Sequence, residues 1–109
     1  AFIEFTEHLR VECGLPIVSF GHAGDGNLHI YILRGELDRD SWLNSTKEVM
    51  DRIYAKAQEL KGLVSGEHGI GFAKRGYLQE SLSPDVLELM RSIKSGFDPK
   101  GLLNPGKVC

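Results

Sequence analysis

Two histidines flank a glycine-rich turn in the segment Gly21–His29, which reads GHAGDGNLH. Each histidine lies at the end of a short apolar, β-branched run, and Asp-Gly is a strong signal for a two-residue hairpin turn. A turn at Asp25-Gly26 pairs His22 directly with His29, which places their Cβ atoms roughly 4.5–5.5 Å apart on one face. That spacing would let both imidazoles bind one metal ion. The alternative is that both are polar side chains at a solvated sheet margin.

A second glycine-rich segment, residues 66–71 with the sequence GEHGIG, carries a carboxylate and an imidazole side by side. Glycine at this density permits tight turns and close approach of the backbone to a ligand. Neighbouring side chains of an extended segment point opposite ways, so Glu67 and His68 are expected to serve different tasks. An ordinary glycine-rich loop with two polar surface residues is the alternative.

These residue types indicate metal-assisted chemistry. Two imidazoles and one carboxylate suit zinc and, less selectively, manganese or iron, and three protein ligands leave coordination positions open, as in catalytic sites. An open divalent ion can bind the hydroxyl and carboxylate oxygens of a 2-hydroxyacid, and His68 beside Glu67 could accept the hydroxyl proton. Oxidation would also need a hydride acceptor, and no GxGxxG motif follows a strand in this sequence.

The sequence pattern around these residues predicts helices and a hairpin, and therefore an α+β fold. Apolar residues recur at helical spacing over residues 2–13, 40–60 and 84–95, and an antiparallel hairpin is expected over 17–34. One hairpin face carries both histidines, while the other sets small residues opposite large aliphatic ones, which suits a helix packed closely on the sheet. Residues 63–65 could add a strand, and a tail of turn residues follows the last helix.

Capping residues predict where the helices begin and end. Asp38 or Asp40 can cap the second helix, and Gly62 is expected to end it. Ser83, followed by a proline, opens the last helix, which Gly96 is expected to close.

The composition indicates one globular domain over residues 1–109, with 41% hydrophobic and 26% charged residues. A formal charge of −2 without a basic run argues against a nucleic-acid partner. No apolar stretch reaches membrane-spanning length, and no secretory signal opens the chain. Cys13 and Cys109 form no disulfide framework, so a reducing, cytoplasmic setting is expected.

Three segments, in this order, resemble the C-terminal end of FAD-linked 2-hydroxyacid oxidoreductases of the vanillyl-alcohol oxidase type. They are GHAGDGNLH at 21–29, SGEHGIG at 65–71 and FDPKGLLNPGK at 97–107. The family includes the glycolate oxidase flavin subunit, D-lactate dehydrogenase and D-2-hydroxyglutarate dehydrogenase, and the resemblance covers residues 1–109. The chain opens inside a helical pattern without methionine, which fits a C-terminal piece of such an enzyme, a partial cap domain without the FAD-binding domain.

The resemblance implies that His22, His29 and Glu67 bind a divalent metal, with zinc as the expected ion. It also implies that His68 is the active-site base and that Asn104 lies near the flavin. FAD would be held mainly by the absent domain, which is then a partner of this chain, together with a small 2-hydroxyacid substrate.

One position departs from part of the family. In the 2-hydroxyglutarate enzymes an asparagine two residues beyond the second histidine helps to hold the substrate, whereas this chain has Tyr31 there. A glycolate-like or D-lactate-like substrate is therefore expected. The isolated chain is expected to be inactive and to self-associate through its uncovered apolar surface. The alternative function is a stand-alone metal-binding module, either a hydrolase that uses a metal-bound water or a non-catalytic interaction domain.

Overall fold

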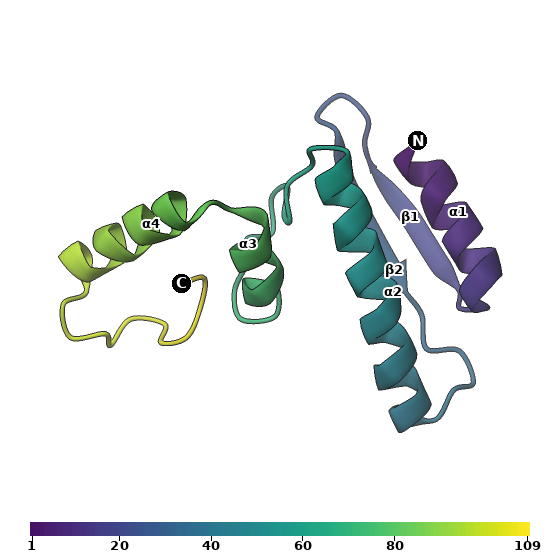
Figure 1. Ribbon diagram of the computed structural model, residues 1–109. Helices are drawn as coiled ribbons and strands as arrows, with labels where there is room; N and C mark the ends of the chain where they lie inside the picture. The colour runs from purple at the N-terminus through teal and green to yellow at the C-terminus, as the bar shows by residue number, and fades with distance from the viewer. The chain divides into compact units, whose positions relative to one another are not determined.

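The computed structural model describes all 109 residues and confirms the predicted α+β class (Figure 1). In chain order the elements are α1 (Phe2–Cys13), β1 (Ile17–His22), β2 (Asn27–Ile32), α2 (Arg39–Glu59), α3 (Arg75–Ser81) and α4 (Pro84–Phe97). They fall into two compact units, Ala1–Gly62 and Leu63–Cys109. None of the helices combines the length and the apolar character that crossing a membrane requires.

The first unit builds one hydrophobic core from α1, α2 and a single face of the β1–β2 hairpin. Leu9 of α1 and Ile17 of β1 are 1% and 5% exposed. The other buried residues of this core are Leu15, between α1 and β1, and Val49 and Ile53 of α2. Partly buried apolar residues of β2 pack against this cluster. Because side chains alternate along a strand, filling one hairpin face with core residues directs the histidines to the opposite face.

The hairpin register differs from the prediction by two residues. Phe20 lies opposite His29, and His22 lies opposite Asn27, whereas a two-residue turn would have paired the two histidines directly. A two-residue type I′ turn needs positive φ at both of its central residues. Here Gly26 has a φ of 69°, but the φ of Asp25 is not positive. The strands are joined instead by the four residues between His22 and Asn27. A shift of two residues preserves the faces, so both histidines still share one.

The start of α2 was predicted correctly, but its end has a different geometry. The Asp38 carboxylate accepts the backbone N–H groups of Asp40 and Ser41, each at 3.0 Å, as expected of a helix cap. Gly62 donates its N–H to the carbonyl of Ala57 at 2.8 Å, but the left-handed conformation falls on Lys61, with a φ of 59°. A lysine therefore occupies the position where glycine is usual.

Several predictions for the second unit are wrong. Residues 63–65 form no strand, since the sheet contains only β1 and β2. The seven-residue helix α3 was not predicted; it is short and begins without a side-chain cap. Ser83 occupies the N-cap position before Pro84, as predicted, although its side chain makes no capping bond. Gly96 does not end α4, which continues to Phe97. A single glycine late in a helix lowers helix propensity but does not end the helix when the following residues supply favourable contacts.

Those contacts centre on Asp98, which follows α4 and is 8% exposed. Its carboxylate accepts the backbone N–H groups of Leu102 at 2.9 Å and Leu103 at 2.8 Å, and it forms an ion pair with Lys94. Lys94 also donates to the carbonyl oxygen of Leu103 at 2.7 Å. Asp98 thus fixes the reversal of the chain between α4 and the tail.

Replacing Asp98 with asparagine is expected to lower the midpoint of thermal unfolding by roughly 5 °C at pH 7, because charge-assisted bonds are lost. The hydrogen bond and charge of Lys94, with the N–H groups of Leu103 and Leu102, lower the pKa of Asp98 below its ordinary value of 3.8. A carboxylate whose pKa is lowered by folding stabilises the fold above its unfolded pKa, and this stabilisation disappears as the pH falls through the folded pKa. The difference between parent and variant should therefore shrink below about pH 4.

Circular dichroism melts across pH 3–7 would measure this difference. Glu88→Gln is the matched control, since Glu88 is an exposed acid of α4, the helix that precedes Asp98, and its carboxylate lies 3.7 Å from the Arg91 guanidinium. Its melting midpoint should stay within about 2 °C of the parent. Equal midpoints for the parent and Asp98→Asn at pH 7 would show that Asp98 does not stabilise the tail.

Candidate metal centre

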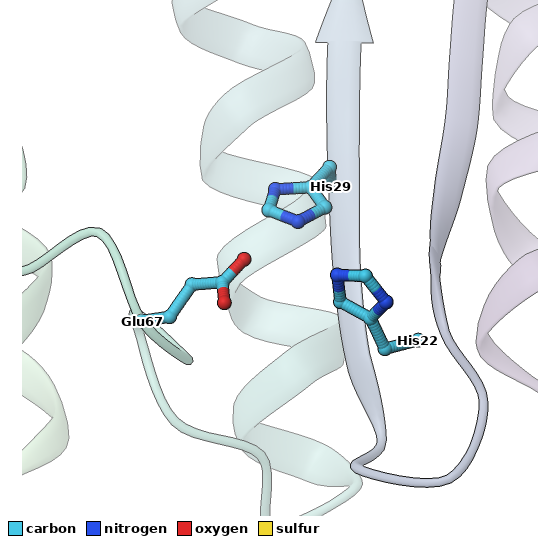
Figure 2. A group of neighbouring side chains, drawn as sticks. All are labelled: His22, His29 and Glu67. Atoms are coloured by element: carbon cyan, nitrogen blue, oxygen red, sulfur yellow. The ribbon is translucent and has the colours of Figure 1, made fainter.

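Two of the three histidines of the first unit converge on the exposed face of the hairpin. His22 ends β1 and His29 lies inside β2, and their ring centroids are 6.1 Å apart with the rings nearly perpendicular (Figure 2). Each offers a ring nitrogen within 4.8 Å of the other. A tetrahedral zinc ion with bonds of about 2.0–2.1 Å holds two nitrogen ligands about 3.4 Å apart, so side-chain rotations that shorten the present separation would bring both nitrogens onto one ion.

The donor chemistry fits a divalent metal ion of the zinc type. Neutral imidazoles are common zinc ligands, and no lysine or arginine lies on the hairpin strands that carry them. His22 is exposed and His29 is half-buried, so an ion and a small ligand could both reach the ring nitrogens. His8, the remaining histidine of this unit, lies exposed on α1. The prediction that His22 and His29 share one face is therefore confirmed by the geometry, while their binding of metal stays a prediction.

Gly21, the residue before His22, has a steric role that the sequence reasoning missed. A Cβ atom at this position would lie 2.0 Å from the carbonyl oxygen of Asn27 on the partner strand. Only glycine therefore permits this close approach of β1 and β2 directly beside the histidine pair. A glycine inside a strand pattern is the signal that could have indicated it, because such glycines often mark close backbone approach.

Phe20 and Tyr31 form an aromatic surface next to the histidines, and the sequence reasoning gave Phe20 no role. The Phe20 ring centroid is 5.4 Å from that of His29 and 5.4 Å from that of Tyr31, on which it stacks with an interplanar angle of 10°. Phe20 is 54% exposed and Tyr31 50% exposed. The alternation of the strand residues places both rings on the histidine face.

Glu67 and His68 lie in the second unit, on the loop that precedes α3. The Glu67 Oε1 atom is 3.7 Å from the His68 Nε2 atom, and the two side chains are 43% and 62% exposed. The expectation that these neighbours point opposite ways is wrong, because the segment adopts a loop conformation rather than an extended strand. Glu67 is the third side chain drawn in Figure 2 and can offer a carboxylate oxygen as a ligand.

Contacts within the second unit hold the ends of this loop. The Lys74 Nζ atom donates to the Ser65 hydroxyl at 3.3 Å, before the GEHGIG segment. At the last residue of that segment, the Gly71 carbonyl oxygen accepts the backbone N–H of Val108 at 2.9 Å. The C-terminal tail therefore rests on the loop that carries Glu67 and His68.

Asn104 lies on the same tail, where the structure gives it a turn conformation. It is exposed, has a φ of 47° and accepts the backbone N–H of Lys107 on its carbonyl oxygen at 3.2 Å. Asparagine tolerates this left-handed conformation better than most residues. A position near the flavin stays a prediction for this residue.

Comparison with known proteins identifies relatives over nearly the whole chain. Residues 1–108 match the family described as FAD linked oxidases, C-terminal domain. The chain is 46% identical over 108 residues to a D-lactate dehydrogenase of Anaerostipes hadrus, covering 99% of this chain and 23% of that protein. It is 44% identical over 93 residues to a D-2-hydroxyglutarate dehydrogenase of Stutzerimonas stutzeri, covering 84% and 20% of the two chains.

A third relative, glycolate oxidase subunit GlcD of Bacillus subtilis, is 39% identical over 106 residues, which are 97% of this chain and 22% of that protein. The chain thus spans about a fifth of the length of these curated relatives. The match to one family across residues 1–108 favours the flavoenzyme interpretation over a stand-alone metal module. The chain belongs to the family of FAD-linked oxidases, as a C-terminal domain of that family.

Proposed function

We propose that this chain supplies a divalent-metal site and the active-site histidine to an FAD-dependent 2-hydroxyacid dehydrogenase or oxidase. The observation that carries the proposal is the convergence of His22 and His29 on one exposed face of a chain in this family. Relatives named as dehydrogenases of D-lactate and D-2-hydroxyglutarate, and as a glycolate oxidase subunit, support the 2-hydroxyacid class.

His22, His29 and Glu67 are the proposed ligands, with zinc as the expected ion. Two imidazoles and one carboxylate complete a three-ligand set that leaves coordination positions for a substrate. When bound, the ion would polarise the hydroxyl and carboxylate oxygens of a 2-hydroxyacid. The exposure of His22 and Glu67 supports this role, because the substrate must reach the same place.

His68 is the proposed base. It would accept the proton of the substrate hydroxyl group as the C2 hydrogen leaves with its electron pair, which converts the 2-hydroxyacid to a 2-oxoacid. FAD, when bound, supplies the acceptor for that hydride. The 3.7 Å separation between Glu67 Oε1 and His68 Nε2 supports this assignment, because a ligand and a base on neighbouring residues would act on the same substrate. Asn104 is proposed to lie near the flavin.

The substrate is proposed to be a small 2-hydroxyacid of the glycolate or D-lactate type. Tyr31 supports this choice, since it follows the second histidine by two residues and presents a half-exposed ring on the same hairpin face. The FAD-binding domain is proposed to lie outside these residues, as a partner of a partial cap domain. About four-fifths of the length of each relative lies beyond the match, which leaves room for such a domain.

The isolated 109-residue chain is expected to be colourless and to oxidise no 2-hydroxyacid. The flavoprotein that contains it should transfer electrons from glycolate or D-lactate to an artificial dye. Absorbance at the flavin bands and dye reduction under identical conditions would measure both properties. The isolated chain should also self-associate in sedimentation, because Phe72, Phe97 and Leu102 are each more than 70% exposed.

Two outcomes would contradict this proposal. Stoichiometric FAD in the purified chain would show that it carries its own flavin site. A flavoprotein that no 2-hydroxyacid reduces would refute the substrate class.

A further inference from the structure

A continuous row of four rings covers the exposed face of the hairpin. Tyr31 stacks on Phe20, Phe20 lies against His29, and His29 meets His22, with successive centroid separations of 5.4, 5.4 and 6.1 Å. Phe20 stands directly opposite His29 in the strand register. The row therefore connects the two imidazoles proposed as metal ligands to a phenylalanine and a tyrosine.

Phe20 restricts the ring of His29 by contact. The two ring centroids are 5.4 Å apart and the ring planes are inclined by 32°, so Phe20 occupies space into which the imidazole could otherwise rotate. Tyr31 in turn holds Phe20, because the two rings are nearly parallel at 10°. Ordering a side chain costs conformational entropy, and a ring that is ordered before the ion arrives avoids part of that cost on binding.

We infer that Phe20 is a positioning residue for the ligand His29, and that Tyr31 supports it. This inference rests on the proposed metal site. Ligating histidines are usually oriented by an outer partner that accepts a hydrogen bond from the second ring nitrogen. Here a stacked aromatic pair, fixed by the pairing of Phe20 with His29, contributes to the same orientation.

Replacing Phe20 with leucine is expected to weaken zinc binding by about tenfold, the lower end of the loss seen when outer partners of metal ligands are removed. The affinity of the 109-residue chain for zinc would be measured by competition with a chromophoric chelator. Phe20→Tyr retains the ring and should bind zinc within about threefold of the parent. Val18→Ala is the matched control, because Val18 is a 46% exposed apolar residue of the same face that lies opposite Tyr31 rather than His29.

NMR spectra of the metal-free chain provide a second measurement beside the zinc titration. Ring currents from Phe20 should displace the ring-proton resonances of His29, so Phe20→Leu should move those resonances in the metal-free chain while Val18→Ala leaves them in place. Equal zinc affinities for the parent and Phe20→Leu would overturn the inference and leave the metal site standing. The same holds if Phe20→Tyr binds as weakly as Phe20→Leu. A parent chain that binds no zinc would instead refute the proposed metal site, and the positioning role with it.

Discussion

Replacing His68 with alanine is expected to slow reduction of the flavin by a 2-hydroxyacid by about 10²–10⁴-fold, the usual contribution of a general base. The reason is that no other imidazole of the second unit could accept the hydroxyl proton, since His68 is its only histidine. Zinc content should stay at the parent level, because the proposed ligands all remain. Anaerobic stopped-flow mixing of the flavoprotein with excess substrate would measure the rate, with metal analysis of the same sample.

His8→Ala is the matched control for this variant. His8 is an exposed histidine on α1, away from the hairpin face that carries His22 and His29. Its replacement should leave both the rate and the zinc content unchanged. An unaltered rate for His68→Ala would refute its role as the base, and loss of zinc from this variant would show that His68 is a ligand.

Most of the first unit could be predicted from its sequence because its signals are local. Helical spacing of apolar residues located α1 and α2 to within one residue at each end, and Asp38 was one of two residues proposed as the cap of α2. The hairpin register was predicted incorrectly. Asp25-Gly26 does not form the expected two-residue turn, and residues 23–26 connect the strands instead. The backbone at Asp25 lacks the positive φ that a type I′ turn requires, and the observed register places Ile17 opposite Ile32.

The second unit was less predictable because distant residues hold it together. The backbone hydrogen bond from Val108 to Gly71 joins residues near opposite ends of this unit, and no local sequence pattern predicts it. Asp98 follows α4 and binds the turn beyond it, which lets the helix pass through Gly96. A sequence pattern can locate such an aspartate but does not show which backbone groups it will bind.

The placement of His22 and His29 on one face was predictable because of the periodicity of strands. Side chains on a strand alternate with a period of two, so an error of two residues in the register keeps both histidines on one face. The separation of the rings depends on the true register and on the missing Cβ of Gly21, and neither follows from the spacing of the histidines alone. The contact of Phe20 with His29 likewise depends on that register.

Replacing His22 and His29 together with alanine is expected to weaken zinc binding by at least about 100-fold. Loss of one outer partner already costs 10–100-fold, and this change removes two direct ligands. A single carboxylate from Glu67 would remain of the proposed set, and one carboxylate holds zinc poorly without imidazole or thiolate partners. Glu67→Gln should cause a smaller loss, since both imidazoles stay in place.

The most direct test of the proposed metal site is a competition titration of the 109-residue chain with zinc and a chromophoric chelator. The parent and His8→Ala should each bind one zinc ion with equal affinity, and the His22→Ala, His29→Ala variant should not compete with the chelator. Equal zinc affinity of the parent and the double variant would contradict the metal site.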